Sequence, residues 1–201
     1  MGFGALRVLN DDLVAGGKGF GWHPHDNMEI ISIPLKGSLI HKDNLGHELV
    51  IRAGEIQVMS TGKGVFHSEY NKEPDKPVEF LQIWIFPNQL NVEPRYDQVK
   101  LDVGYNHLQQ VLSPEAGGEG VWIYQDAWFH LGRWDAGRDF EYQLKKKGNG
   151  VYLFVIRGAF QAEGERLEGR DGLGITGTEM ITLRSLEPDS ELLVIEVPMN
   201  K

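Results

Sequence analysis

The sequence predicts an all-β protein made of two β-barrels in tandem. Short segments rich in β-branched and aromatic residues recur along the chain, and many of its 25 glycines fall between them. This spacing of strands and turns is typical of an all-β sandwich or barrel. No stretch up to residue 87 has helical periodicity over about 11 or more residues.

A divergent internal repeat indicates that the barrel is duplicated. The segment Ile33–Leu39 resembles Phe154–Phe160, and Phe80–Pro87 resembles Leu192–Pro198. In both halves the first of these segments contains a glycine between two strand-like runs. A duplication of one β-barrel is the simplest explanation of two matched segments.

The boundary between the halves is expected where the strand pattern is interrupted. Residues 88–118 are rich in loop-forming residues, including Pro94, Pro114 and a Gly-Gly pair. We therefore expect a first barrel over residues 1–90, a linker over 91–118 and a second barrel over 119–201.

The individual strands are assigned from β-rich runs bounded by turn residues. Pro24 cannot donate to a sheet ladder, so its segment is expected at a sheet edge or strand start. Asp43–Gly46 is a hairpin signal, and Pro87 ends a strong strand. In the first half the expected strands cover residues 6–9, 21–25, 29–35, 38–41, 47–51, 56–59, 65–69 and 79–86. In the second half they cover 121–125, 127–133, 150–156, 159–163, 172–175, 179–183 and 191–197.

Composition excludes several classes of function. Acidic residues outnumber basic ones by 29 to 20, giving a net charge of −9, which opposes phosphate-driven binding to nucleic acid. The absence of cysteine excludes disulfides, thiolate ligands and a cysteine nucleophile. The sequence shows no signal-peptide pattern and no apolar run near the roughly 20 residues of a membrane helix. We expect a cytoplasmic monomer without membrane contact.

Two short segments carry potential metal ligands at spacing i, i+2. They are Gly21–His25, with His23 and His25, and Val65–Glu69, with His67 and Glu69. Side chains two apart on a strand point to the same face, so neighbouring strands would aim all four ligands at one point. Three imidazoles and a carboxylate suit Fe, Mn, Zn, Ni or Cu. One H-x-H pair among seven histidines would be unremarkable by chance, whereas two pairs within β-like segments favour a metal site.

Other candidate residues receive structural interpretations. His107 and His130 stand alone, without a paired ligand, so a structural or surface role is expected for each. His41 lies in a strand, and we expect it to support the site rather than to bind the metal. Trp84 lies inside an apolar strand and is assigned to the core, while Trp22 should face away from the side occupied by His23.

The motifs resemble those of a known family. The pattern G-(x)5-H-x-H-(x)3-E, from Gly17 to Glu29, resembles the first cupin motif, and the segment from Gly54 through Gly62 to His67 resembles the second. The fuller string, which continues through Met59–Gly64 to His67-Ser68-Glu69, is similar to the pirin family, above all to bacterial pirin-like quercetin 2,3-dioxygenases.

This resemblance implies a bicupin fold, two double-stranded β-helix barrels with metal only in the first. It implies that His23, His25, His67 and Glu69 bind the metal and that Glu69 also acts as the catalytic base. Ordinary cupins use a glutamate at the position of Glu29, which also has an even offset from His25. Family members begin with a further N-terminal segment that includes a strand, so we expect the first barrel to be incompletely covered on one side.

The activity implied is that of a metal-dependent quercetin 2,3-dioxygenase, which cleaves a flavonol with dioxygen and releases carbon monoxide. Fe(II) is the first choice of metal, with Mn, Ni, Cu, Zn or Co as alternatives. Two other functions remain open on the same platform. One is a metal- and redox-sensitive regulatory protein with protein partners, and the other is a different cupin reaction on a small molecule.

Overall fold

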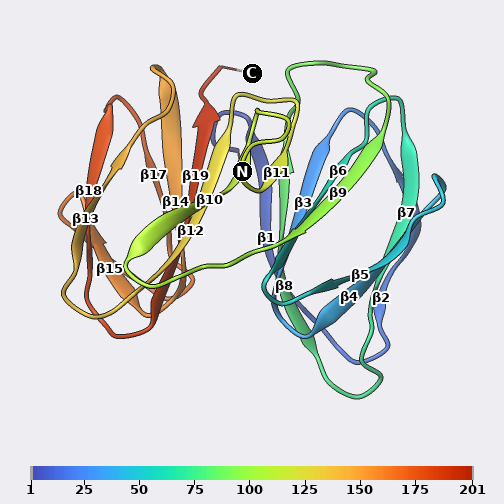
Figure 1. The fold of residues 1–201 in the computed structure, drawn as a ribbon, viewed down its shortest axis with the longest axis horizontal. Helices are drawn as coiled ribbons and strands as arrows, with labels where there is room; N and C mark the ends of the chain where they lie inside the picture. Colours follow the sequence, from blue (N-terminus) through green and yellow to red (C-terminus); the bar gives the residue numbers. More distant parts are fainter. Residues whose placement is uncertain (1, 201) are drawn as a thin grey trace. The chain divides into compact units, whose positions relative to one another are not determined.

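The computed structural model describes residues 2–200, and all regular secondary structure in that range is β. Nineteen strands are formed within these residues, joined by turns and loops (Figure 1). No helix long and apolar enough to span a membrane occurs in this part of the chain. The all-β class expected from the sequence is therefore confirmed.

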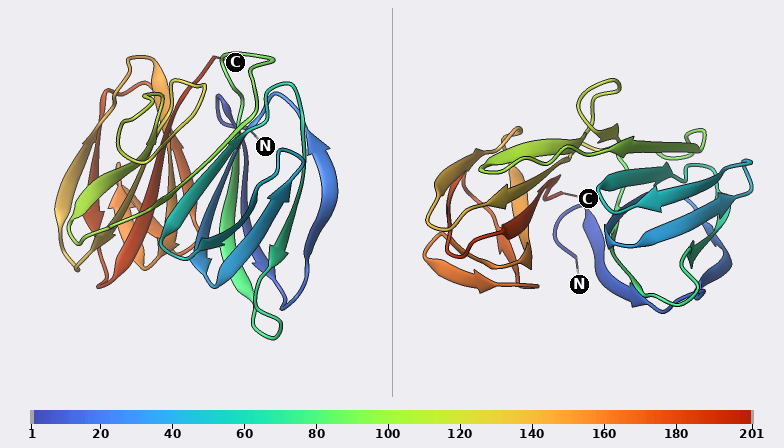
Figure 2. Two further views of the ribbon diagram at one scale, coloured as in Figure 1. Left: turned by 45° about the vertical axis from the view of Figure 1, so that its right-hand side comes forward. Right: turned by 60° about the horizontal axis from the view of Figure 1, so that its bottom comes forward.

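The chain forms two compact units. The first consists mainly of residues 6–101 and 115–125, and the second of residues 102–114 and 126–200, together with residues 3–5. In both units the strands form two sheets that face each other, and every sheet consists of antiparallel pairs (Figures 1 and 2).

Residues 91–118 differ from the linker that we expected. They hold two strands, β9 (Arg95–Lys100) and β10 (His107–Ser113). β9 pairs with β6 (Glu55–Ser60) in the first unit, whereas β10 pairs with β12 (Trp128–Trp134) in the second. β9 is half-exposed along most of its length and mixes polar with apolar residues, so its sequence lacks the alternation that marks a strand.

The first unit contains the strands that position the candidate site. One sheet has the order β1-β8-β3-β6-β9 and the other the order β2-β7-β4-β5. The bounds of the first sheet's remaining strands are β1 (Leu6–Val14), β8 (Val78–Ile85), β3 (Glu29–Lys36) and β6 (Glu55–Ser60). Those of the second are β2 (Gly19–His25), β7 (Val65–Asn71), β4 (Ser38–Asp43) and β5 (Glu48–Arg52).

The second unit repeats this two-sheet plan. Strands β10, β12, β19, β14 and β17 follow one another within one sheet, and β13, β18, β15 and β16 form the other. Their bounds are β12 (Trp128–Trp134), β19 (Ser190–Pro198), β14 (Asn149–Arg157), β17 (Gly172–Ile175), β13 (Asp139–Gln143), β18 (Met180–Ser185), β15 (Ala159–Ala162) and β16 (Glu165–Glu168). The two-residue strand β11 (Val121–Trp122) lies in the segment assigned to the first unit.

The interiors of the two units differ in chemistry. The second is filled by one apolar cluster to which both of its sheets contribute, with Trp134, Val194 and Leu153 from one sheet and Phe160 and Ile181 from the other. Such burial is the main favourable term in folding.

Two smaller apolar clusters lie in the first unit. One centres on buried residues of the loop before β3 and of β3, β6 and β7, namely Met28, Ile30, Met59 and Val65. The other joins β4 and β8 through Leu39, Val78 and Phe80. Buried polar side chains, described below, belong to neither cluster.

Each copy of the repeat has one glycine at the equivalent turn. Gly37 lies between β3 and β4 with φ +79°, and Gly158 lies between β14 and β15 with φ +73°. Both values are in the left-handed region that L-residues with a Cβ avoid. A Cβ on Gly37 would lie 3.4 Å from its nearest neighbour, whereas one on Gly158 would lie 2.2 Å from Ser190 Oγ and 2.8 Å from Ser190 Cα.

We therefore predict that Gly158→Ala destabilises the protein more than Gly37→Ala. The left-handed backbone alone costs roughly 1–2 kcal/mol in each variant. Steric overlap adds about 1–3 kcal/mol only at Gly158. Differential scanning calorimetry of both variants against the wild type measures the two effects, and equal losses would contradict the steric argument.

Candidate metal centre

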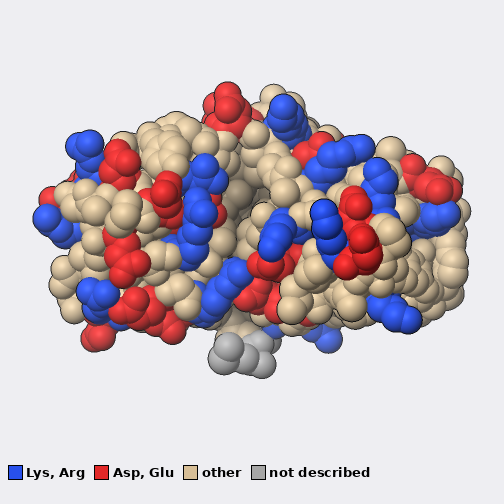
Figure 3. Space-filling model, turned by 90° about the horizontal axis from the view of Figure 1, so that it is seen from below, with Lys and Arg blue, Asp and Glu red and all other residues tan. Residues whose placement is uncertain are grey.

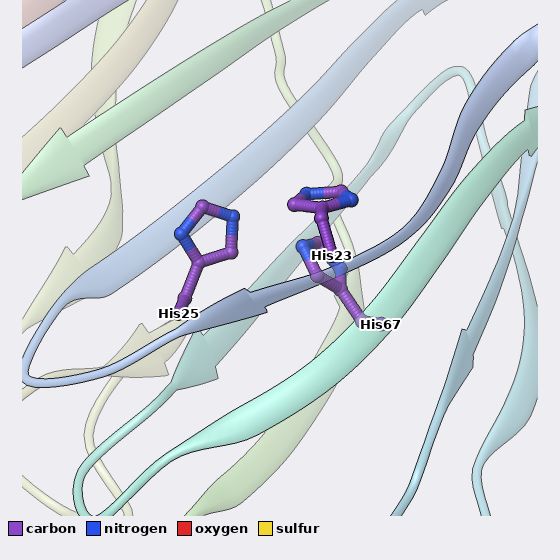
Figure 4. A group of neighbouring side chains, drawn as sticks. All are labelled: His23, His25 and His67. Carbon is purple, nitrogen blue, oxygen red and sulfur yellow. The ribbon is translucent and has the colours of Figure 1, made fainter.

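Strand pairing brings three histidine rings together at one edge of the first unit. β2 pairs antiparallel with β7, and His23 lies directly opposite His67 in the register. His25 follows two residues later on β2 and therefore points to the same side of the strand. Ring centroids lie 4.8 Å apart for His23 and His25, 4.3 Å for His23 and His67, and 5.1 Å for His25 and His67. Figure 4 shows the three side chains projecting from these two strands toward one another.

The three histidine rings have nitrogen lone pairs that are not used in hydrogen bonds and could bind a metal. One nitrogen from each of the three rings lies within 4.8 Å of the other two. His23 Nδ1 is 2.7 Å from the carbonyl oxygen of Gly21, so Nδ1 carries the proton and Nε2 has a lone pair. His67 is buried, and neither of its ring nitrogens has a hydrogen-bond partner within the described chain.

Burial keeps two of these rings neutral. Burial, reinforced by the neighbouring His23, lowers the pKa of His67 to about 3 and that of His25 to about 4. A neutral imidazole is the form that binds a metal. Near neutral pH the group therefore offers lone pairs rather than positive charge.

Glu69 lies on the same inner face of β7 as His67 and is completely enclosed. It accepts hydrogen bonds from Gln82 Nε2 at 2.6 Å and from Ser32 Oγ at 3.2 Å. Burial raises the pKa of the Glu69 carboxyl despite these two donors. Glu69 forms a second group of potential ligands with His41 and His67, all buried, with one donor atom of each within 4.8 Å of the others.

Glu29 belongs to neither group of potential ligands. Its carboxylate accepts a hydrogen bond from Ser60 Oγ at 2.7 Å and lies near the Arg95 guanidinium. Burial raises the pKa of Glu29 to about 7, although Ser60 and Arg95 act in the opposite direction. The structure thus places Glu69, and not Glu29, beside His67.

Several residues around these groups were not identified from the sequence. Asp43 follows His41 on β4 and collects four donors: the Leu45 and His47 backbone amides on Oδ1, and the His41 and His47 rings on Oδ2. Tyr96 stacks on His47 and also contacts His41. The only sequence signal for Gln82 and Ser32 is that each is a polar residue between apolar neighbours in the middle of a strand.

The other residues singled out in the sequence lie away from the three histidine rings, except for Trp84, which contacts His25. His107 is exposed, and His130 is buried against Tyr142 in the second unit; neither joins a group of three potential ligands among residues 2–200. Trp22 is 58% exposed. Trp84 packs on the cluster of Met28 and Ile30, as expected for a core residue, but its ring also lies 4.8 Å from that of His25.

Comparisons with known proteins place this geometry in a family. Residues 1–85 match the family described as Pirin, and residues 110–197 match the family described as Quercetinase C-terminal cupin domain. A protein named quercetin 2,3-dioxygenase from Escherichia coli is 38% identical over 200 residues, covering 98% of this chain and 84% of that protein. The chain belongs to the pirin family.

Further pirins support this assignment in sequence and in structure. A pirin-like protein from Caulobacter vibrioides is 38% identical over 201 residues, covering 98% of this chain and 84% of that protein. The crystal structure of the bacterial pirin YhhW from Escherichia coli in complex with nickel(II) has a TM-score of 0.92 at 36% identity and covers 98% of this chain and 84% of that one. The two two-sheet units and these pirin neighbours confirm the bicupin fold expected from the resemblance.

The raised pKa of Glu29 predicts how the stability of the folded protein changes with pH. A folded-state pKa of about 7, raised from the ordinary 4.5, means that the folded protein holds this proton more tightly than the unfolded chain. Stability contributed by neutral Glu29 is then present at acid pH and is lost as the pH rises from about 4.5 to 7. The loss should approach roughly 3 kcal/mol.

Glu29→Gln keeps the shape of the side chain and removes this titration. We predict that the variant gains stability relative to the wild type across the same pH interval and that the difference is constant above pH 7. Urea unfolding of both proteins between pH 4.5 and 8 measures the difference. Parallel stability curves over that whole interval would contradict the assigned environment of Glu29.

Proposed function

We propose that this pirin binds one divalent transition metal through His23, His25, His67 and Glu69. The observation that carries the proposal is the buried His67 ring, which has no hydrogen-bond partner for either nitrogen within residues 2–200 and lies among two further imidazoles and a carboxylate. The donor set of imidazole and carboxylate suits such a metal. The nickel(II) complex of YhhW supports the same proposal. Fe(II) is our first choice, with Mn, Ni, Cu, Zn or Co as alternatives.

We further propose that the chain is a quercetin 2,3-dioxygenase-like enzyme acting on a flavonol and dioxygen. The relatives that carry this name support the substrate class. A divalent metal bound here would supply Lewis acidity and redox chemistry. The protein's own residues bind and orient the substrate, exclude water and move its proton.

In this proposal Glu69 accepts the proton of the substrate hydroxyl. A chain of hydrogen bonds holds its carboxylate in place: Trp84 Nε1 donates to Gln82 Oε1 at 3.2 Å, and Gln82 Nε2 donates to Glu69 Oε2. The bond from Trp84 fixes the orientation of the Gln82 amide, so its NH₂ group faces Glu69. Ser32 holds the other carboxylate oxygen. The Trp84 ring beside His25 supplies apolar surface for a flat aromatic molecule.

The charge distribution bears on the alternative of a regulatory protein. Lys and Arg side chains are interspersed with Asp and Glu on the face drawn in Figure 3. This mixture and the net charge of −9 support protein partners over direct contact with nucleic acid. The dioxygenase remains our principal proposal, because the enclosed Glu69 and the half-buried Gln82 beside it suit a small molecule rather than a protein surface.

The metal proposal predicts the outcome of single histidine substitutions. His23→Ala, His25→Ala and His67→Ala each delete a ligand, so each should lose most of the tightly bound metal. Elemental analysis after dialysis against metal-free buffer measures the remainder. His107→Ala and His130→Ala are matched controls and should keep the wild-type content. Full metal content in any of the three ligand variants would refute that ligand's assignment.

The role proposed for Glu69 predicts that Glu69→Gln and Glu29→Gln have different effects on activity. Glu69→Gln keeps the shape but removes the charge and the basicity, so flavonol turnover should fall by roughly the 10²–10⁴-fold that a general base contributes. Metal content should fall less than in a histidine variant, because three imidazoles remain. Glu29→Gln should be milder in both respects.

Turnover is measured as dioxygen consumption and carbon monoxide release, with every protein loaded with the same metal. Activity lost with Glu29→Gln and kept with Glu69→Gln would reverse the assignment of the two carboxylates. A wild type that consumes no dioxygen with any flavonol, under several divalent metals, would remove the enzyme proposal and favour a binding protein.

A further inference from the structure

A second group of side chains that could bind a metal lies in the first unit and is more deeply buried than the first. It consists of His41 on β4 together with His67 and Glu69 on β7, and all three are buried. β4 and β7 are paired with His41 directly opposite Glu69, so both side chains project from the same face of this sheet. The rings of His41 and His67 lie 5.5 Å apart.

Asp43 determines which nitrogen of His41 carries the proton. His41 Nε2 lies 3.1 Å from Asp43 Oδ2, and this carboxylate also accepts from the His47 ring and from two backbone amides. A carboxylate with such partners acts as an acceptor only, so Nε2 of His41 must be the N–H donor. Nδ1 therefore has a lone pair, and it is buried without a hydrogen-bond partner anywhere in the described chain.

The arrangement matches that of a metal-binding histidine. Such a residue commonly donates its other ring N–H to a carboxylate, which fixes its tautomer and orientation. His41 has this carboxylate in Asp43, and one of its ring nitrogens lies within 4.8 Å of a ring nitrogen of His67 and of a carboxylate oxygen of Glu69. His41 Nδ1 and both ring nitrogens of His67 are buried without a hydrogen-bond partner in the described chain, which is unfavourable, and a cation bound by them would remove that penalty.

We propose that His41, His67 and Glu69 form an inner metal position, adjacent to the proposed position of His23, His25, His67 and Glu69. The two positions share His67 and Glu69, so they are alternative positions for one ion. The inner one binds a divalent ion independently of His23 and His25 and more weakly, because it offers only two imidazoles. This inference deepens the proposed function, since it adds His41 to the residues that hold a metal in the first unit.

The test uses Co(II) as the probe and the double variant His23→Ala/His25→Ala as the background. Equilibrium dialysis with elemental analysis gives the bound Co(II), and its visible absorption bands report changes in the ligands. The double variant should still bind close to one Co(II) per chain, with an affinity lower than that of the wild type. Adding His41→Gln should weaken this remaining binding by at least the roughly 10–100-fold that loss of a mere supporting partner costs.

Substitution by glutamine removes the Nδ1 lone pair of His41 while it keeps the hydrogen bond to Asp43 that supports the fold. A glutamine amide can take the place of Nε2 and still donate to Asp43, but it offers no equivalent of Nδ1. His47→Asn is the matched control, because His47 binds the same carboxylate through Nδ1, lies partly in solvent and belongs to neither group of ligands. It should leave Co(II) binding unchanged. Circular dichroism and thermal unfolding of the metal-free variants show that each is folded.

The outcomes separate the two metal positions. If the double variant binds no Co(II), or if His41→Gln leaves its binding and absorption bands unchanged, the inner position is refuted and the outer one is unaffected. If His23→Ala and His25→Ala leave wild-type binding intact while His41→Gln abolishes it, the outer assignment fails and the inner one stands. If the wild type binds no Co(II), both are refuted.

Discussion

The first unit depends on the burial of His67, an imidazole with no partner for either ring nitrogen in the described chain. Each unpaired buried polar group costs about 1–3 kcal/mol. The surrounding strands force this arrangement, because β7 is paired on both sides and its alternation turns His67 and Glu69 inward together. A bound cation offsets the cost, so folding of this unit and metal binding are thermodynamically linked.

The second unit shows what the same architecture does without such a constraint. Its buried carboxylate, Glu196, accepts four hydrogen bonds, from the Tyr142 hydroxyl, the Lys145 and Lys146 backbone amides and the Asn149 side chain. Through these donors Glu196 holds the chain around residues 145–149 in place, which is a structural role. Glu69 has two donors and shares its surroundings with imidazole lone pairs. The number of protein donors around a buried carboxylate therefore distinguishes a structural anchor from a candidate reactive group.

The sequence was sufficient for the class of fold and for the strands with strong apolar character. It missed β9, β10, β13 and β16, because these are short or half-exposed and carry too many polar residues for alternation to be visible. Spacing placed His23, His25 and His67 on one side correctly. It could not choose between Glu29 and Glu69, since both have an even offset and the choice depends on neighbours supplied by other strands.

The role of Asp43 could not be predicted from the sequence either, because it too depends on contacts made in the folded chain. It occurs within a hairpin signal, where an aspartate is expected for turn formation alone. Its hydrogen bonds to the amides of Leu45 and His47 do shape that turn. Only the folded chain shows that the second oxygen of the same carboxylate holds the ring of His41.

Pro24, between the two histidines of β2, has a consequence for the behaviour of the protein in a crowded solution. β2 is the last strand of its sheet, so one side of its backbone is unpaired within residues 2–200. An open strand edge of this kind is a template for the β-aggregation of neighbouring chains. A proline has no N–H to offer such a chain and interrupts any ladder that forms there. Pro24 therefore removes one hydrogen-bond donor from the strand that carries His23 and His25.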